Sequence, residues 1–450
     1  MEITKEIKEA VTSLSKFNLD FLEFVEKNPG TCKRSNFKLL ELNHDLFTLQ
    51  PWPTFINKAT RSRFREAGLE LCALIKSIPR RIFNYDFEKM SRFYNIPVNS
   101  LKRQFEGVNR KHLDNQLGRG DFILSPSGLK CLEYNFSASL GGWQVPIWES
   151  LYLNTPLIAR FFKEYGVKTI RENLILTFLE HLVRSAPEEI FSGEQEMNIV
   201  MVGPQFGEGK SPIKSYLSML YKQVLRQKAP SLRGNIHACD YCHLEIVDGC
   251  IFHKAERIHT LVEMYRGYVP PEIMTVFKSG NVHLMNGPVS VLLANKLNLA
   301  LLSEGCETDI FTGEEKEIIR RYVPWTRKIE SGLVDFIRSN RESLVIKPGS
   351  GYGGTGVCVG RKVAKEQWEY AVKTAVTKGN WVVQERVDTV GGLYQAGDEG
   401  YDVHDMSWGF FVFGPWYAGV WVRVLPRKNN RGVINCHQGA TVSVVFNVDE

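Results

Sequence analysis

The sequence lacks a basic stripe, a long uncharged run and a regular set of cysteines. Its formal net charge is +6 over 450 residues, and no segment gathers Lys and Arg into one stretch, so we expect no nucleic-acid partner. The longest uncharged run, 406–422, is interrupted by Gly414-Pro415 and is shorter than the ~20 residues of a membrane-spanning helix. We interpret it as two aromatic strands joined by a turn, and we expect no membrane partner.

The cysteines argue against a protein stabilised by disulfides. There are nine of them, an odd number scattered along the chain, which favours a reducing compartment over a disulfide framework. The first residues, Met1–Glu6, are charged and lack the apolar core of an export signal. We therefore expect a cytoplasmic protein.

The length favours roughly two or three domains. Residues 1–115 carry apolar side chains at helical spacing, and we expect a mostly helical region there. Residues 166–285 combine a buried strand at Asn198–Val202 with a hairpin around Asp248-Gly249, which predicts an inserted α/β layer. A helix near Leu292–Ser303 and a run of strands follow it. The fold class is therefore α/β or α+β.

The segment 117–136 is the most informative part of the chain. Two strand-like runs flank Pro126-Ser127-Gly128, where Pro fits the start of a type I turn and Gly the left-handed residue after it. A three-residue hairpin loop of this kind pairs Ser125 with Leu129, Asp121 with Glu133, and Arg119 with Asn135. The side chains alternate with period two, so these polar groups would share one face.

Two carboxylates placed opposite each other need a shared proton, a cation or a metal. The oxygens of Asp121, Glu133 and Asn135 suit Mg²⁺, which prefers carboxylates together with substrate phosphates. A register that differs by one residue remains open, and it would send Asp121 and Glu133 to opposite faces.

A second strong element is the run Leu344–Gly360. An apolar strand ends in Lys347, a loop dense in glycine follows, and another apolar strand begins at Val357. Glycines allow backbone N–H groups to close on phosphate oxygens, and the lysine adds a point charge. A strand follows the loop where a dinucleotide fingerprint or a Walker loop would need a helix. A plain flexible hairpin is the alternative.

Polar residues interrupt the apolar strand Trp381–Val387 at Gln384 and Glu385, where they could contact an adenine edge and ribose hydroxyls. Two other motifs do not fit the kind of site that they suggest. The run Gly203–Ser211 has one residue too many for a Walker loop. A zinc site formed by Cys239, Cys242, Cys250 and His253 is disfavoured, because the Asp248-Gly249 turn would place Cys242 and Cys250 ~16 Å apart.

Taken together, these motifs resemble the circularly permuted ATP-grasp ligases, the group that includes eukaryotic glutathione synthetase and glutathionylspermidine synthetase. The resemblance spans residues 115–442. It rests on motifs that occur in the family's order: Arg119-Gly120-Asp121, Glu133-Tyr134-Asn135, the loop 135–142, Asn286-Gly287-Pro288, Asn295-Lys296, Val323-Pro324-Trp325-Thr326, Lys347-Pro348, Gln384-Glu385, Arg423, Gly432–Asn435 and Gly439-Ala440.

The resemblance implies an ATP-grasp fold, circularly permuted, that binds ATP between two antiparallel β-sheets. Residues 116–165 would form the metal-binding strands of this core and residues 286–450 its nucleotide-binding region. The helical N-terminal region and the inserted α/β layer, as a substrate domain, would complete the chain.

The resemblance also implies a role for each motif residue. Asp121, Glu133 and Asn135 would hold Mg²⁺. In glutathione synthetase an acidic residue of the glycine-rich loop is a metal ligand, but no acidic residue lies between Lys347 and Gly360 here. The resemblance to glutathionylspermidine synthetase therefore implies Asp121 as the third ligand. The remaining residues fall into three groups: ATP contacts by Lys296, Lys347, Ser350, Gly351, Gly353, Gly354, Gln384 and Glu385; catalytic roles for Arg119 and Arg423; and substrate contacts by Ser137, Ser139 and Arg423.

The implied function is an ATP-dependent carboxylate–amine ligase that forms an amide bond through an acyl phosphate, on a small amino-acid-like or peptide substrate. Two alternatives stay open: a small-molecule phosphotransferase, and a catalytically silent nucleotide-binding protein. As partners we expect small-molecule carboxylates and amines, with a homodimer as one arrangement of the chain.

Overall fold

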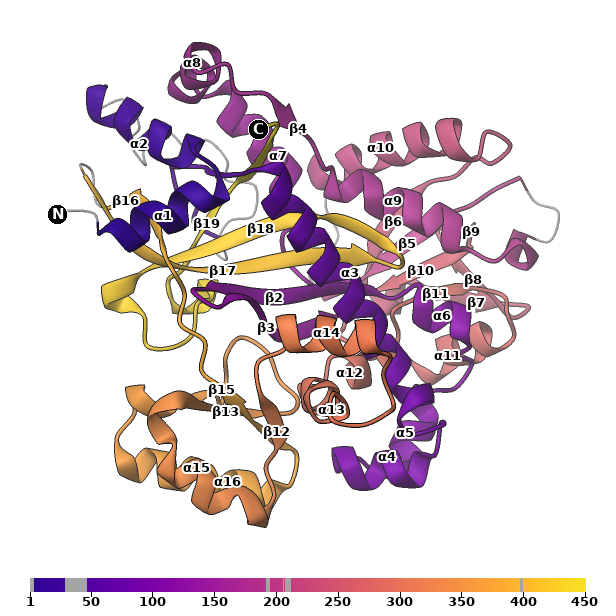
Figure 1. Cartoon of the computed structure of the whole chain (residues 1–450). Helices are drawn as coiled ribbons and strands as arrows, with labels where there is room; N and C mark the ends of the chain where they lie inside the picture. Colours follow the sequence, from indigo (N-terminus) through magenta and orange to yellow (C-terminus); the bar gives the residue numbers. More distant parts are fainter. Residues whose placement is uncertain (1–3, 29–46, 192–194, 205, 207–211, 397–399) are drawn as a thin grey trace.

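The computed structural model describes residues 4–28, 47–191, 195–204, 206, 212–396 and 400–450. The largest element is a six-stranded antiparallel sheet in the order β19-β18-β17-β2-β3, with β16 paired to β17 (Figure 1). Its strands are β2 Leu117–Ser125, β3 Gly128–Phe136, β16 Gly392–Gln395, β17 Tyr401–Phe413, β18 Trp416–Pro426 and β19 Thr441–Ser443. The two aromatic strands predicted around Gly414-Pro415 are confirmed as the β17–β18 hairpin.

The hairpin β2–β3 has the predicted pairs at Asp121 and Arg119, but its turn differs from the predicted one and it contains a bulge. Ser125 pairs with Gly128, so the turn has two residues and the predicted Ser125–Leu129 pair is wrong. A β-bulge between Asp121 and Phe122 then restores the register, and Asp121 lies opposite Glu133 and Arg119 opposite Asn135, as predicted. The bulge inserts Leu132 as one unpaired residue on β3, which bends the strand there.

A four-stranded parallel sheet lies beside this core, in the order β11-β10-β5-β6. It is formed by β5 Ile199–Val202, β6 Ile236–Cys239, β10 Thr260–Glu263 and β11 His283–Met285. A small antiparallel sheet of β7 Glu245–Val247, β8 Cys250–His253 and β9 Glu256–Ile258 is attached to it. Val247 pairs with Cys250, which confirms the Asp248-Gly249 turn. The rejected Walker run includes residues 205 and 207–211, which lie outside the described residues.

A second antiparallel sheet has the order β12-β15-β13-β14. Its strands are β12 Thr326–Lys328, β13 Leu344–Pro348, β14 Cys358–Val359 and β15 Trp381–Glu385. Helices α15 Val334–Ser339 and α16 Lys365–Lys378 cover one face of it, in a layer at the lower left of Figure 1. The predicted helix 292–303 is wrong in one respect: it is broken into α12 Val289–Leu293 and α13 Leu297–Gly305, with Lys296 at the break.

In the described part of the chain before β2, most residues are helical, and the short strand β1 Thr54–Ile56 pairs in parallel with β20 Val445–Val448 near the C-terminus. Strand β4 Thr169–Ile170 completes that three-stranded sheet. The remaining helices are α1 Lys5–Leu14, α2 Phe17–Lys27, α3 Lys58–Arg81, α4 Phe87–Tyr94, α5 Val98–Gln104, α6 Arg110–Asp114, α7 Val145–Asn154, α8 Pro156–Glu164, α9 Leu174–Ser185, α10 Pro212–Lys228, α11 Pro271–Lys278 and α14 Gly313–Tyr322. Within the described ranges, no helix has both the length and the apolar character needed to cross a membrane.

Helix α3 packs across one face of the central sheet (Figure 1). The Phe410 ring stacks between Phe64 of α3, at 4.5 Å between ring centroids, and Phe122 of β2, at 4.4 Å. Phe410 pairs with Gly120, which leaves space above the strand for these rings. This aromatic stack anchors the sheet that carries the polar residues of β2 and β3.

We therefore expect Phe410→Ala to lower the free energy of unfolding by about 3–5 kcal/mol, because the truncation leaves a cavity between α3 and the sheet. Urea denaturation measures this loss. Tyr370→Ala, at a side chain that is 74% exposed on α16, is the control and should change little. Equal effects of the two substitutions would contradict the assignment of this stack as the sheet's anchor.

Candidate active site

The face of the central sheet opposite α3 gathers charged and polar side chains from three strands. Arg119 and Asp121 come from β2, Glu133 and Asn135 from β3, and Arg423 from β18. Across the antiparallel pairs Arg119–Asn135 and Asp121–Glu133 the side chains share one face. These side chains therefore share a face because strand residues alternate with period two and because the bulge restores the register of the pairs.

Two guanidinium groups hold the Asp121 carboxylate. Arg119 donates to it from two of its three guanidinium nitrogens, Nε to Oδ1 at 2.8 Å and Nη2 to Oδ2 at 3.0 Å. Arg423 Nη2 lies 3.1 Å from Asp121 Oδ1. Burial by itself would raise the pKa of Asp121, but Arg119 and then Arg423 hold that pKa below its usual range. The carboxylate is thus ionised at neutral pH, and both of its oxygens have cationic partners.

Trp421 provides a common platform for these arginines. The Arg119 and Arg423 guanidinium carbons lie 5.3 and 5.6 Å from its ring centroid, within cation–π range. Arg423 also donates to Ser407 Oγ at 3.0 Å. The sequence analysis did not select Trp421 or Ser407. Trp421 precedes Arg423 by two residues on one strand, so the period-two alternation was a signal that could have placed it on the same face.

Glu133 faces Lys296, which arrives from a distant part of the chain. Lys296 Nζ lies 3.1 Å from Glu133 Oε2 and donates to the Gly351 carbonyl at 2.8 Å. Although burial raises the pKa of Glu133, the charge of Lys296 leaves that pKa below its ordinary value. The break between α12 and α13 places Lys296 here, and its backbone N–H donates to Gly349 O at 2.8 Å.

Lys347 reaches the bulge of β3 from the second antiparallel sheet. Its Nζ donates to the Leu132 carbonyl at 3.2 Å and to Gln384 Oε1 at 2.6 Å. Gln384 in turn donates to Thr326 Oγ1 at 3.0 Å. Burial lowers the pKa of Lys347 to about 8, because attraction by Glu133 offsets only part of the desolvation of the ammonium group. The Leu132 carbonyl had no distinct signal in the sequence, whereas Thr326 ends the motif Val323-Pro324-Trp325-Thr326 of the sequence analysis.

Glu385 does not join this network. It follows Gln384 on β15, so its side chain is directed to the other face of the strand, and it is exposed. Its backbone N–H donates to Trp325 O at 2.8 Å. The structure thus separates Gln384 and Glu385, which the sequence analysis assigned to one role.

The glycine-rich loop lies against the same cluster. Asn295 Nδ2 donates to Ser350 Oγ at 3.4 Å, and Asn435 Nδ2 donates to the Gly353 carbonyl at 2.8 Å. A Cβ atom at Gly354 would lie 2.7 Å from Val433 Cγ1, so a side chain there would force the neighbour to move. The motif 432–435 therefore packs directly on the loop after β13.

The small-residue loop after β3 borders Arg119. Arg119 Nη1 donates to the Leu140 carbonyl, and Ser137 Oγ accepts from the backbone N–H of Ser139 at 2.9 Å. A Cβ atom at Gly141 would lie 3.5 Å from the Trp421 ring. Ser137 and Ser139 therefore stand beside the guanidinium cluster.

The predicted magnesium ligands lie close together but fit the ion only in part. Asn135 Nδ2 is 3.4 Å from Asp121 Oδ2 and from Glu133 Oε1. Arginines already hold both oxygens of Asp121, whereas Glu133 and Asn135 are only partly buried. Over the part of the chain that the structure describes, no three His, Cys, Asp or Glu residues are arranged to hold a metal, and this includes the cysteines around residue 242.

The cluster as a whole carries more positive than negative charge. Two carboxylates, Asp121 and Glu133, face the cations Arg119, Arg423, Lys296 and Lys347. Buried charge is costly unless it is paired, so this surplus favours an anionic ligand. Phosphate oxygens meet that requirement, and they can also bring a divalent ion that needs few protein ligands.

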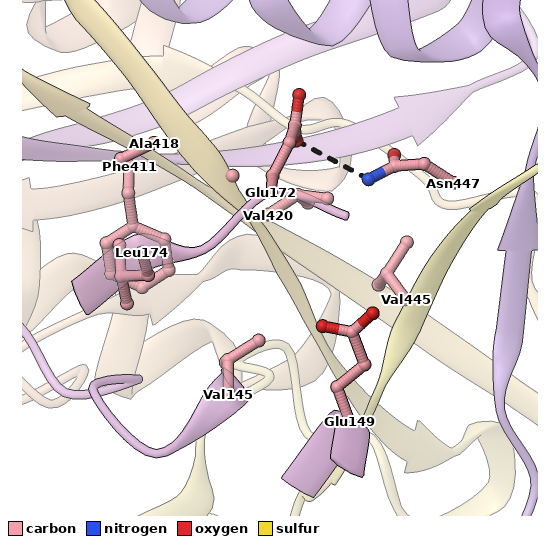
Figure 2. Close-up of a pocket in the computed structure, with 10 residues that line it drawn as sticks. Val145, Glu149, Glu172, Leu174, Phe411, Ala418, Val420, Val445 and Asn447 are labelled. Carbon is pink, nitrogen blue, oxygen red and sulfur yellow. Dashed lines mark hydrogen bonds between the residues drawn. The ribbon is translucent and has the colours of Figure 1, made fainter. Parts of the chain in front are cut away.

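A separate cavity is lined by residues of β17, β18, β20, α7 and α9. Figure 2 shows Glu149 and Glu172 facing it among apolar side chains, with Glu172 bonded to Asn447. None of the residues that the sequence analysis selected lines this cavity. It provides a partly buried carboxylate, Glu149, outside the charged cluster.

No protein-family model matches the sequence, and no curated protein matches it. Among solved structures, the chain is similar to a glutathione synthetase-like effector from Globodera pallida in its apo form, with a TM-score of 0.56 and 10% identity over 99% of this chain and 98% of that one. This similarity shows a shared fold. It confirms, at the level of fold, the resemblance drawn from the sequence motifs; the circular permutation stays a prediction.

Two further solved structures are more distant. A putative gamma-glutamylcysteine synthetase from Methylobacillus flagellatus has a TM-score of 0.41 and 12% identity, covering 84% of this chain and 88% of that one. A D-alanyl-alanine synthetase A from Vibrio cholerae has a TM-score of 0.27 and 9% identity, covering 57% and 89%.

We expect Asp121→Asn to lower the free energy of unfolding by about 3–5 kcal/mol, because it leaves two buried guanidinium groups without their anion. The folded pKa of Asp121 lies below its ordinary value, so the contribution is complete above about pH 5 and is lost as the pH falls toward 2. Urea denaturation at pH 7 and at pH 3 measures both effects. Asp335→Asn, at an exposed ion pair, is the control, and an Asp121→Asn protein as stable as that control would refute the role of the cluster.

Proposed function

We propose that this protein is an ATP-dependent carboxylate–amine ligase of the ATP-grasp type. The observation that carries the proposal is the meeting of Lys296 and Lys347 with the β2–β3 hairpin, through Glu133 Oε2 at 3.1 Å and the Leu132 carbonyl at 3.2 Å. The similarity in fold along the whole chain supports it. ATP would bind between the six-stranded sheet and the sheet of β12–β15.

In this proposal the lysines are the phosphate contacts. Lys296 exchanges Glu133 and the Gly351 carbonyl for phosphate oxygens, and Lys347 exchanges part of its bonding at Leu132 and Gln384. The loop 350–356 closes over the phosphates through its backbone N–H groups. Glu133 and Asn135 would hold Mg²⁺, which neutralises phosphate charge when it is bound. Asp121 would join them only after a guanidinium group leaves it.

The arginines act on the reacting groups. Arg119, fixed by Asp121 and Trp421, is placed to stabilise the phosphoryl group during transfer. A substrate carboxylate oxygen attacks the γ-phosphorus and ADP leaves; an amine then attacks the acyl carbon, releases phosphate and loses its proton. Arg423 is the residue proposed to orient the carboxylate, beside the loop with Ser137 and Ser139.

One observation favours a second candidate, a nucleotide-binding protein without turnover. Arginines hold both oxygens of Asp121, and no acidic residue lies between Lys347 and Gly360. A metal site with so few free carboxylates could bind nucleotide yet fail to align the phosphoryl group. Turnover distinguishes the two candidates, because both predict nucleotide binding.

The proposed partners are a small carboxylic acid with amino-acid or peptide character and a small amine. The compartment proposed is the cytoplasm, which suits the free thiols of Cys72, Cys131, Cys242, Cys250, Cys306, Cys358 and Cys436. A homodimer is the proposed assembly.

We expect the protein to release ADP from ATP and Mg²⁺ when supplied with amino acids or short peptides, and to form a hydroxamate when hydroxylamine replaces the amine. Glu133→Gln should lower this rate about 100- to 1,000-fold, by analogy with the loss of one group that stabilises charge in the transition state. A coupled ADP assay measures the rate, with Glu149→Gln as the control for a partly buried carboxylate outside the site.

Undiminished hydroxamate formation by Glu133→Gln would refute the assignment of the site. Tight ATP binding by the unmodified protein, without ADP release for any pair of substrates, would establish the silent alternative. A stable phosphorylated product would indicate a phosphotransferase.

The lysine at the bulge gives a pH-dependent prediction. The pKa of Lys347 in the ligand-free protein is about 8, so the ammonium group is charged below that pH and neutral above it. We expect the affinity for ATP-γ-S to fall as the pH rises through about 8, and binding there to take up protons, because phosphate raises the lysine pKa. Calorimetry in buffers of different ionisation enthalpy measures the uptake.

Lys347→Met should abolish this proton uptake and weaken binding about 10- to 100-fold, the range expected for one charged hydrogen bond. Lys365→Met, on the exposed surface of α16, is the control. Binding by the unmodified protein that takes up no protons between pH 7 and 9 would exclude Lys347 from the phosphate contacts.

A further inference from the structure

The glycine-rich loop has one contact that the proposed chemistry does not use. The Arg266 guanidinium carbon lies 3.6 Å from the centroid of the Tyr352 ring, a stacked arrangement. Tyr352 belongs to the loop after β13 and is 63% exposed, and Arg266 lies in the turn that follows β10 of the parallel sheet. The contact therefore joins the inserted sheet to the loop proposed to cover the phosphates.

The turn that carries Arg266 is held in an unusual conformation. Arg266 has φ +58° and Gly267 φ +91°, so two consecutive residues adopt the left-handed region. The Glu263 carboxylate is fully buried at the end of β10, and its Oε2 accepts the Gly267 N–H at 2.8 Å. Such a conformation persists only where surrounding groups determine it, and Glu263 is one of those groups.

The turn is also wedged against the helix that precedes Lys296. A Cβ atom at Gly267 would lie 2.3 Å from Val291 Cγ2 on α12. A side chain at Gly267 would therefore force the Val291 side chain to move. Glu263 on one side and α12 on the other thus fix the direction of Arg266.

The loop itself needs such external restraints. Gly351, Gly353, Gly354 and Gly356 all have positive φ, and glycine backbones lose much conformational freedom when they are ordered. Lys296 holds the Gly351 carbonyl, and Asn435 holds the Gly353 carbonyl. Arg266 adds a third restraint at Tyr352, between these two positions.

We propose that Arg266 and Tyr352 form a clasp that positions the glycine-rich loop, and that Glu263 is a positioning residue which directs Arg266 toward it. The clasp couples the inserted sheet to closure over the phosphates, and in that respect it rests on the proposed function. An anionic substrate bound near Arg266 would compete with the Tyr352 ring and thereby change the order of the loop.

The test is hydrogen exchange of backbone amides 350–357 in the ligand-free protein. Exposed cation–π pairs are weak, so we expect Arg266→Ala and Tyr352→Leu each to speed this exchange about two- to fivefold. Tyr352→Phe should retain protection, because the ring is kept. The double variant Arg266→Ala/Tyr352→Leu should match the single variants, and Tyr370→Leu is the control for an exposed tyrosine.

The role of Glu263 is tested with two substitutions, one of which can still accept the hydrogen bond from the Gly267 N–H. Glu263→Gln keeps an oxygen for the Gly267 N–H and should retain loop protection, whereas Glu263→Leu removes the acceptor and should speed exchange as Arg266→Ala does. Equal protection in the two Glu263 variants would overturn the role of Glu263. If Glu263→Leu does not fold, Glu263→Gln still decides, because faster exchange in that variant also overturns the role.

Titration with Mg²⁺ and ATP-γ-S separates the clasp from the proposed function. Arg266→Ala should weaken ATP-γ-S binding about two- to fivefold, with no further loss on adding Tyr352→Leu. If the unmodified protein binds no ATP-γ-S, the proposed function fails, and the exchange measurement alone decides the clasp. Unchanged exchange in both single variants, or additive effects in the double variant, would overturn the clasp.

Discussion

The arrangement depends on two ammonium groups from the second half of the chain that are held against a hairpin from the first half. Lys296 is paired with Glu133, and Lys347 donates to a carbonyl that the bulge leaves unpaired. An ammonium group taken out of water costs several kcal/mol unless it is paired. These contacts therefore satisfy the lysines and fix the second antiparallel sheet relative to the first.

The same charges make the cluster receptive to a ligand. Asp121 and Glu133 compensate only part of the positive charge of two arginines and two lysines. Burial lowers the pKa of Lys347, because attraction by Glu133 offsets only part of the desolvation of its ammonium group. An anion that binds between the sheets would compensate the remaining positive charge. Trp421 under both arginines limits their orientations, so the site is ordered before any ligand arrives, which lowers the entropic cost of binding.

The sequence predicted most where periodicity and motif order suffice. Alternation along β2 and β3 placed Arg119, Asp121, Glu133 and Asn135 on one face, although the turn was wrong and an unforeseen bulge corrected the register. Motif order brought Lys296 and Lys347 toward that face. Periodicity does not predict which tertiary partner each group finds, so the pairing of Arg423 with Asp121 and the helix break at Lys296 appeared only in the structure. Strand alternation, by contrast, would already have placed Glu385 on the face away from Gln384.

The contact at the bulge has a consequence for how such a protein can diverge. Lys347 binds the main-chain oxygen of Leu132, and every amino acid offers that oxygen. Substitution at residue 132 is thus free to drift as long as the strand keeps its extra residue and the new side chain packs. A contact of this kind depends on backbone shape and not on the identity of the side chain, so the fold can keep it even where few residues are kept.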